Sequence, residues 1–303
     1  MMELDQVPET KVEKKADSVE ITVSMSGAIP TASFENFRPL YSIKKSYSQN
    51  LSENEIENIT EKMREKLQNK LDEDFLRGIK KRIEKQRKDL RLYEFDGKIY
   101  PSVTTILNPY GIDYDPYLLA QFAARGTIVH KIAENMIIQI QNGVKLADIE
   151  LLDPKECNSI ADEVKLVENG TLGLTWKSVS PKGFWKKYGK HFDLEKAKTE
   201  MKVKSDKYLF AGTLDLRAKY RNIPCVLDWK TSKSYSGEKL ENYKQQLAAY
   251  AKNSGADIGI IAPLKPQNKS GYGKPIIVEK EELEQCWGQF LQAREKFREI
   301  YGM

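Results

Sequence analysis

Hydrophobic periodicity predicts a short sheet followed by a long helix in the first part of the chain. From Val19 to Ser24 apolar and polar residues alternate, which is typical of a half-buried strand. A second strand is expected from Phe37 to Lys45, at a sheet edge because Pro39 cannot donate a backbone hydrogen bond. Ser52 and Glu55 form a capping-box pattern that begins a helix. Apolar residues follow at helical steps of three and four: Ile56, Ile59, Met63, Leu67, Leu71, Phe75, Ile79 and Ile83.

The rest of the chain alternates predicted helices with predicted strands. Phe95-Asp96-Gly97-Lys98-Ile99 is a tight-turn signal between short apolar stretches and predicts a hairpin. Ser102 or Thr104 can cap a helix that Pro109 ends. Because helices flank a run of strands, the predicted fold class is mixed α/β. Helices are expected at 116–142, 151–169, around 194, 237–252 and 280–301, and strands at 199–205, 208–219, 224–231, 258–263 and 275–278.

Three parts of the chain differ in composition. Residues 1–17 are polar and charge-mixed, which predicts a disordered tail. Residues 18–95 form a predicted accessory region, and residues 96–303 contain the elements of one α/β domain. No apolar run approaches the roughly 20 residues that span a bilayer. No apolar secretory segment follows the first methionine either, so we expect a soluble intracellular protein with no membrane partner.

The distribution of charge favours an anionic partner. The chain carries 49 lysines and arginines against 44 acids, a formal net charge of +5. A basic run between Leu76 and Arg91 lies at the end of the predicted long helix. It is interpreted either as a solvated helix end, where the macrodipole favours cations, or as an arm that follows phosphates. The cysteines, Cys157, Cys225 and Cys286, are too far apart for a disulfide framework or a metal ribbon and are interpreted as ordinary thiols.

Two predicted neighbouring strands carry the chemically informative residues. Asp228 and Lys230 are two apart, so in a strand both point to one face while Trp229 points to the other. Asp215 lies on the preceding strand, and the short connection between the strands can fold it alongside. Two carboxylates in such a place repel unless a cation lies between them, and Mg²⁺ or Mn²⁺ is the usual ion for oxygen ligands. The alternative is an ordinary ion pair on a surface strand.

This arrangement resembles the PD-(D/E)XK nuclease superfamily, in its RecB-like and Cas4-like branch. Mitochondrial genome maintenance exonuclease and phage RecB-like exonucleases are similar members of that branch. Arg125-Gly126-Thr127-Ile128-Val129-His130 is similar to the family's Gly-x-x-x-His motif, and Thr199-Glu200 lies where the family often carries a glutamate. Thr231-Ser232-Lys233 follows the Asp-x-Lys core, and Gln246 to Tyr250 is similar to the Gln-x-x-x-Tyr motif. The motifs occur in the family's order over about residues 100 to 301.

The resemblance implies a fold and a site. The fold is a restriction-endonuclease-like core, a central mixed β-sheet flanked by helices, here preceded by a hairpin and a long helix. His130, Asp215 and Asp228 are the implied ligands of Mg²⁺ or Mn²⁺, with the main-chain carbonyl of Trp229 as a further ligand. Lys230 is implied to position or activate the attacking water. The implied catalytic residues are Asp215, Asp228, Lys230, Gln246 and Tyr250, the last two contacting the scissile phosphate or steadying the site.

The chain also departs from the family pattern. Cas4-like nucleases bind an iron–sulfur cluster through one cysteine before the core and three after it, whereas only Cys286 follows the core here. We therefore expect no iron–sulfur cluster. A Gly-x-x-x-x-Gly-Lys-Ser/Thr loop is missing from the sequence, so a helicase or recombinase would be supplied by another protein.

A basic and aromatic segment is the predicted nucleic-acid contact. Between Trp176 and His191 there are five lysines and no acid, interleaved with aromatic residues that can stack on the bases of a single strand. The alternative is a partly buried aromatic cluster covered by lysine stems. The predicted contacts are Trp176, Lys182, Trp185, Lys186, Lys187 and Tyr188, together with Thr231, Ser232 and Lys233 beside the core.

Two functions follow from these observations. The first is a metal-dependent DNA exonuclease that acts on single strands or DNA ends in recombination, replication or repair. The second is a non-catalytic DNA-binding accessory protein that keeps the nuclease fold. In either case the expected location is the cytoplasm of a bacterial or phage-infected cell.

Overall fold

The computed structural model describes residues 9–15, 18–26, 29–32, 35–37, 40–48, 51–86, 90–110, 115–172 and 175–303. The chain divides into two compact units. The amino-terminal unit comprises residues 1–89 and 110–114, and the carboxy-terminal unit comprises 90–109 and 115–303. In the part of the chain that the structure describes, every helix is too short or too polar to cross a membrane.

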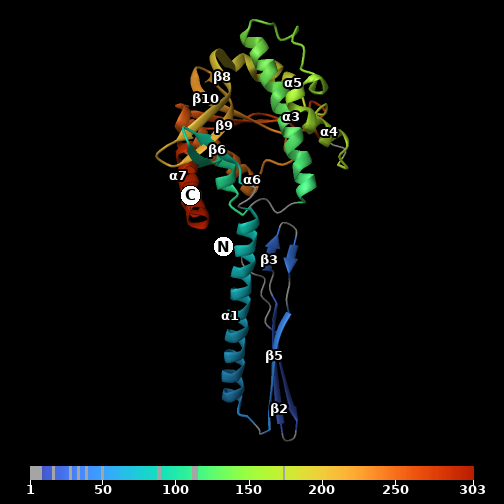
Figure 1. The fold of residues 1–303 in the computed structure, drawn as a ribbon, viewed down its shortest axis with the longest axis vertical. Helices are drawn as coiled ribbons and strands as arrows, with labels where there is room; N and C mark the ends of the chain where they lie inside the picture. Colours follow the sequence, from blue (N-terminus) through green and yellow to red (C-terminus); the bar gives the residue numbers. More distant parts are fainter. Residues whose placement is uncertain are drawn as a thin grey trace. The chain divides into compact units, whose positions relative to one another are not determined.

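The amino-terminal unit is a sheet packed on a long helix. Strands β1 (Glu9–Lys15), β2 (Ser18–Ser26) and β5 (Leu40–Tyr47) are antiparallel with β2 in the centre, and α1 (Glu53–Gln86) runs beside them (Figure 1). β3 (Ile29–Ala32) and β4 (Glu35–Phe37) pair separately. The buried core joins alternate residues of β2 with one stripe of α1: Val19, Ile21, Val23, Met25, Met63, Leu67 and Leu71.

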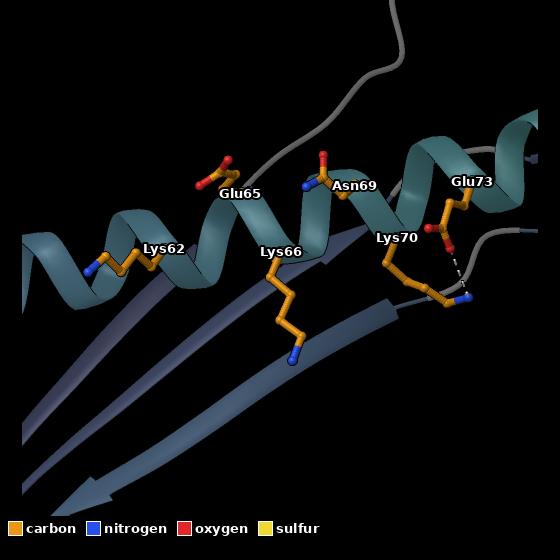
Figure 2. A pocket seen from close by; sticks show the side chains of 6 residues that line it. All are labelled: Lys62, Glu65, Lys66, Asn69, Lys70 and Glu73. Carbon is orange, nitrogen blue, oxygen red and sulfur yellow. Dashed lines mark ion pairs between the residues drawn. The ribbon is translucent and has the colours of Figure 1, made fainter.

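The predicted capping box begins α1. The Ser52 amide donates to Glu55 Oε2 at 2.9 Å, and the Glu55 amide donates to Ser52 Oγ at 3.3 Å. The side of α1 away from the apolar stripe is polar, and a shallow hollow there has only polar and charged walls (Figure 2). It is lined by Lys62, Glu65, Lys66, Asn69, Lys70 and Glu73.

In the amino-terminal unit one prediction is wrong and another needs a new boundary. Residues 9–15 of the expected disordered tail form β1, which pairs with β2 along its whole length. An edge strand needs few apolar residues, because its neighbour satisfies the backbone and its charged side chains stay in water. The expected edge strand at 37–45 is confirmed as β5, which lies at the edge of the sheet but begins at Leu40, while Phe37 belongs to β4. Residues 1–8 and 16–17 lie outside the described residues, as do most side chains of the basic run from 76 to 91, so the phosphate-following arm stays a prediction.

The carboxy-terminal unit is built on a five-stranded mixed sheet in the order β12-β11-β10-β9-β8. β10 and β11 are parallel and are joined through α6, while the other neighbours are antiparallel. The predicted mixed α/β class is therefore confirmed. The elements are β6 (Leu92–Phe95), β7 (Lys98–Pro101), α2 (Val103–Leu107), α3 (Pro116–Gln141), α4 (Ala161–Glu168), α5 (Pro181–Tyr188), β8 (Phe192–Ser205), β9 (Phe210–Tyr220), β10 (Ile223–Lys230), α6 (Gly237–Ser254), β11 (Ile258–Pro263), β12 (Ile276–Val278) and α7 (Lys280–Tyr301).

Helices cover both faces of this sheet. Leu216, Leu227 and Trp229 lie in a core cluster with residues of α3, α4 and α5. On the other face α6 and α7 pack against each other and against β11, and Phe210 contacts Phe290 of α7 with ring centroids 4.9 Å apart (Figure 1). The strand residues that alternate with the core cluster therefore point toward α6.

The carboxy-terminal unit corrects three boundaries. The predicted helix around residue 194 is part of β8, because Phe192 and Asp193 pair with β9. The helix expected at 151–169 begins only at Ala161, after two 3₁₀ turns. The predicted hairpin is confirmed as β6 and β7, with positive φ at Asp96 and Gly97. Because the hairpin belongs to this unit, the unit begins at residue 90 rather than 96.

Removing apolar volume from the core of the amino-terminal unit should destabilise that unit. Leu67→Ala deletes a side chain that is 4% exposed, and we expect a loss of about 2–5 kcal/mol. The measurement is amide hydrogen exchange of β2, which should become faster. Lys66→Ala, at an exposed neighbour, is the matched control and should leave the exchange of β2 unchanged. Unchanged exchange in Leu67→Ala would contradict the packing of α1 on the sheet.

Candidate active site

Three acidic residues lie in one row across the sheet. The pairing of the flanking residues places Glu200 of β8 and Asp228 of β10 on either side of Asp215 of β9. Asp215 and Asp228 are buried, with 8% and 4% of their surface exposed. A row of buried carboxylates is unfavourable unless positive charge lies next to it. The prediction that two carboxylates converge on neighbouring strands is confirmed.

The first positive group beside Asp215 is His130. One turn of α3 separates His130 from Gly126, and its Nδ1 lies 3.1 Å from Asp215 Oδ1. Its Nε2 lies 2.8 Å from the carbonyl oxygen of Trp229. Both ring nitrogens can donate only when the imidazole is protonated. Burial lowers the pKa of His130, but the charge of Asp215 and the hydrogen bond to it outweigh burial and raise that pKa to about 9.

Asp215 is held by two donors. Its Oδ1 faces His130, and its Oδ2 accepts a hydrogen bond of 2.7 Å from the Trp229 amide. Burial alone would raise the pKa of Asp215, but the charge of His130 outweighs it, so the pKa is lowered and the carboxylate stays ionised. The imidazolium of His130 thus lies between two oxygens, one from Asp215 and one from Trp229, both of a kind that binds hard cations.

The second positive group is Lys230, which belongs to a network with Asp228 and α6. Lys230 Nζ lies 2.7 Å from Asp228 Oδ2 and donates to Gln246 Oε1 at 2.9 Å. Gln246 Nε2 lies 3.4 Å from Asp228 Oδ1 and 3.2 Å from the Tyr250 hydroxyl. Burial raises the pKa of Asp228 to about 6. Burial lowers the pKa of Lys230, but the charges of Asp228 and Asp215 outweigh it, so the ammonium is retained.

Glu200 joins the site in a strained conformation. Its φ of 46° lies in the left-handed region, which non-glycine residues adopt rarely. Although Glu200 as a whole is exposed, partial burial of its carboxylate and the charge of Asp215 raise its pKa to about 7. The ligand atoms of His130, Glu200 and Asp215 all lie within 4.8 Å of one another.

The structure therefore brings most of the predicted site together and adds a residue. His130, Asp215 and the carbonyl of Trp229 meet as expected. Among the described residues, the group of close ligand atoms contains Glu200 and leaves out Asp228, whose carboxylate faces Lys230. The sequence noted Glu200 from its place before the Gly-Thr-Leu-Asp segment but did not include it among the ligands. Strand register and the unusual backbone of Glu200, which a single sequence does not reveal, bring its carboxylate to Asp215.

Gly212 lies too close to the Tyr250 ring to carry a side chain. A Cβ on Gly212 would lie 2.6 Å from Tyr250 Cε1 and 3.0 Å from its hydroxyl. Tyr250 is 4% exposed, and burial raises its pKa above the ordinary value, so it stays a neutral hydroxyl. The missing side chain at Gly212 leaves room for the Tyr250 ring against β9, where the Tyr250 hydroxyl contacts Gln246.

Two of the predicted single-strand contacts, Trp176 and Trp185, are buried in the structure. Trp176 and Trp185 are 7% and 5% exposed and lie in the core cluster, so their faces are not available to bases. Tyr188 is half-buried against Phe184, with ring centroids 5.0 Å apart. The alternative of a partly buried aromatic cluster is the one that the structure bears out.

The lysines of this segment divide into two kinds. Lys182 Nζ donates to the Ile149 carbonyl at 2.8 Å and thus holds a neighbouring loop. Lys186 and Lys187 are exposed and stay predicted contacts. Beside the core, Thr231 is half-buried, Ser232 is buried and Lys233 is exposed.

Comparisons with known proteins do not assign the chain to a family. Neither a family model nor a curated protein matches the chain. Among solved structures, the crystal structure of SSO0001 is similar with 16% sequence identity and a TM-score of 0.32, over 74% of this chain and 84% of that chain. The site is therefore interpreted from its own chemistry.

The protonation states predict how stability depends on pH in the absence of metal. The pKa of His130 is raised from 6.5 to about 9, so its stabilising contribution is complete below pH 6.5 and is lost as pH rises through 9. Raised pKa values of about 7 for Glu200 and about 6 for Asp228 act in the same direction, because ionising these carboxyls disfavours the folded state. In EDTA, the unfolding temperature should fall from about pH 5 to about pH 9. Glu200→Gln should flatten the part of this profile near neutrality; a profile that rises with pH would contradict the assigned charges.

The approach of Gly212 to Tyr250 predicts a steric effect. Gly212→Ala should destabilise the protein by about 1–3 kcal/mol in denaturant titrations, because the buried ring has to move. Gly288→Ala is the matched control, since a Cβ there meets nothing within 4 Å and Gly288 lies inside α7. The control should be neutral or stabilising by about 0.5–1 kcal/mol. Equal stability of the two variants would argue against the close contact.

Proposed function

We propose that this protein is a metal-dependent deoxyribonuclease of the RecB-like branch of the PD-(D/E)XK superfamily. It would act as an exonuclease on DNA ends or single-stranded DNA. One observation carries the proposal: Asp215, Asp228 and Lys230 lie together on adjacent strands, with His130 from a helix beside them. The Asp-x-Lys spacing, the Gly-x-x-x-His helix and the mixed sheet all support it, since these are the parts that the resemblance implies.

The donor set fits Mg²⁺ or Mn²⁺. Carboxylate and carbonyl oxygens with one imidazole suit hard or borderline divalent ions rather than soft ones. Asp215, the carbonyl of Trp229 and His130 would hold the ion, with Glu200 or Asp228 completing the set. Such an ion polarises a phosphoryl oxygen and lowers the pKa of bound water. Because the protonated His130 lies among these donors without metal, binding would require it to lose its proton.

Lys230 would position the attacking water and stabilise charge on the phosphate. Its ammonium is retained in the buried site, so it donates hydrogen bonds rather than accepting a proton. Gln246 fixes its direction through Oε1, and the same amide contacts Asp228 and the Tyr250 hydroxyl. Gln246 therefore contacts Lys230 and Asp228 directly, and Tyr250 contacts Gln246. These contacts support the interpretation that Gln246 and Tyr250 steady the site.

The expected partner is DNA, met at an end or as a single strand. A helicase or recombinase from another protein would supply such substrates, and the cytoplasm of a bacterial or phage-infected cell is the expected place of action. Exposed Lys186, Lys187 and Lys233 can contribute to phosphate contacts. Base stacking on Trp176 and Trp185 is no longer part of the proposal.

Cleavage of labelled DNA in Mg²⁺ or Mn²⁺ tests the function. Lys230→Met should lower the rate by about 100-fold or more, because it removes the donor that orients water. Asp228→Asn should have a comparable effect, and EDTA should abolish the activity. Asp162→Asn, whose side chain is 97% exposed, is the matched control and should cleave like the unmodified protein.

The products distinguish the two modes of cleavage and the two functions. Substrates labelled at either end, with free or blocked termini, should release mononucleotides or short fragments only from a free end. Cleavage that survives Lys230→Met and EDTA would assign the activity to other residues. DNA binding without cleavage in either metal would favour the non-catalytic accessory protein.

A further inference from the structure

Arg125 is a buried cation that pairs with no acid in the part of the chain that the structure describes. It is 4% exposed and lies on α3, five residues before His130. Among the described residues, its Nη2 donates to the Thr231 carbonyl and its Nε has no partner. A buried guanidinium without a carboxylate is costly, so the position calls for an anion or for full satisfaction by carbonyls.

Arg294 in the same unit shows how a purely structural arginine is satisfied. It is 6% exposed, and its Nε lies 2.9 Å from the Tyr208 carbonyl and 3.1 Å from the Leu209 carbonyl. Its Nη1 donates to the Met303 carbonyl at 2.8 Å. Arg125 has one carbonyl where Arg294 has three, so its charge is left open to a ligand.

A second unpartnered group lies on the connection between β10 and α6, residues 231–236, to which Arg125 donates its hydrogen bond. Ser232 is 8% exposed, and its Oγ has no hydrogen-bond partner within the described ranges. It directly follows Thr231, whose Oγ1 lies 4.0 Å from the position of a Cβ on Gly126. Arg125 and Ser232 therefore flank one short connection, packed against α3.

This connection starts at the catalytic lysine. Thr231 is the residue after Lys230, and the Tyr235 hydroxyl donates to the Lys230 carbonyl while accepting from the Ser232 amide at 3.1 Å. A strand whose scissile phosphate lies at Lys230 would place a neighbouring phosphate beside this connection. A guanidinium and a hydroxyl are suitable donors for phosphate oxygens.

We propose that Arg125 and Ser232 bind the phosphate next to the scissile one on the substrate strand. The proposal rests on the nuclease function and adds a binding subsite to it. The phosphate supplies the negative charge that Arg125 lacks within the protein. Arg125 is thus a binding residue, and its hydrogen bond to Thr231 positions Ser232 for the same ligand.

A chemical double-mutant cycle tests the subsite in the full-length protein. The probe is a short single-stranded oligodeoxynucleotide in which one phosphate at a time is replaced by a neutral methylphosphonate, with binding measured in Ca²⁺. At one position the replacement should weaken binding by the unmodified protein on the order of tenfold, the loss expected for a charged hydrogen bond. Arg125→Gln should bind the unmodified strand more weakly by a similar factor and be insensitive to replacement at that position.

Ser232→Ala and Arg294→Gln complete the design. Ser232→Ala keeps the bond between Arg125 and Thr231, so it tests the subsite even if Arg125→Gln folds poorly, and it should show partial insensitivity at the same phosphate. Arg294→Gln should lower stability and leave the position dependence intact. If Arg125→Gln weakens binding by the same factor for every probe, the subsite is overturned and Arg125 has a purely structural role.

The outcomes for the subsite and for the nuclease are distinguishable. Position-specific coupling without cleavage in Mg²⁺ or Mn²⁺ would leave the subsite standing and overturn the nuclease. Cleavage without coupling would overturn the subsite alone. Failure of the unmodified protein to bind any of the strands would overturn the subsite, while the cleavage assay in Mg²⁺ or Mn²⁺ decides the nuclease independently.

Discussion

The site depends on placing cations against a row of carboxylates that the sheet brings together. Asp215 and Asp228 are buried on neighbouring strands, where their mutual repulsion is weakly screened. His130 offsets the first and Lys230 the second, at 3.1 Å and 2.7 Å. Each carboxylate keeps one further donor, the Trp229 amide or the Gln246 side chain. In the proposed function, a divalent ion would take over the positive charge that the imidazolium provides.

The aromatic core on the opposite face of the sheet serves this arrangement. Trp229 lies between Asp228 and Lys230 in sequence and points away from them, into a cluster where its ring meets Phe184 edge to face at 5.3 Å. Phe184 belongs to α5, whose Trp185 is buried beside Phe192. Phe184 thus anchors the strand that carries Asp228 and Lys230, and the two tryptophans that were predicted to stack on bases lie in the same buried cluster. Fixing the backbone there fixes both the Trp229 amide and the Trp229 carbonyl, each of which contacts a site residue.

Several parts of the fold and the site are readable from single residues. The boundaries of α7 and β11 agree with the predicted ranges, because their apolar periodicity is strong and their ends carry clear signals. The capping box at Ser52 and the hairpin at Gly97 also follow from local chemistry. Local patterns failed for β1, whose stability comes from pairing with β2 rather than from its own side chains. They failed equally for residues 176–191, which include α5, because lysines beside aromatic residues conceal a buried cluster there.

Local patterns in the sequence are enough to predict that Asp228 and Lys230 share one face, that Gln246 and Tyr250 share another, and that the chain mixes helices with strands. Strand and helix geometry set these relations within a few residues. Three features follow only from the folded chain: Glu200 reaches Asp215, the Asp228 carboxylate faces Lys230, and Arg125 is buried with its Nε unpartnered among the described residues. These features depend on strand register, on the left-handed backbone of Glu200 and on the burial of side chains by distant segments. Such properties arise between segments far apart in the chain, where local periodicity carries no information.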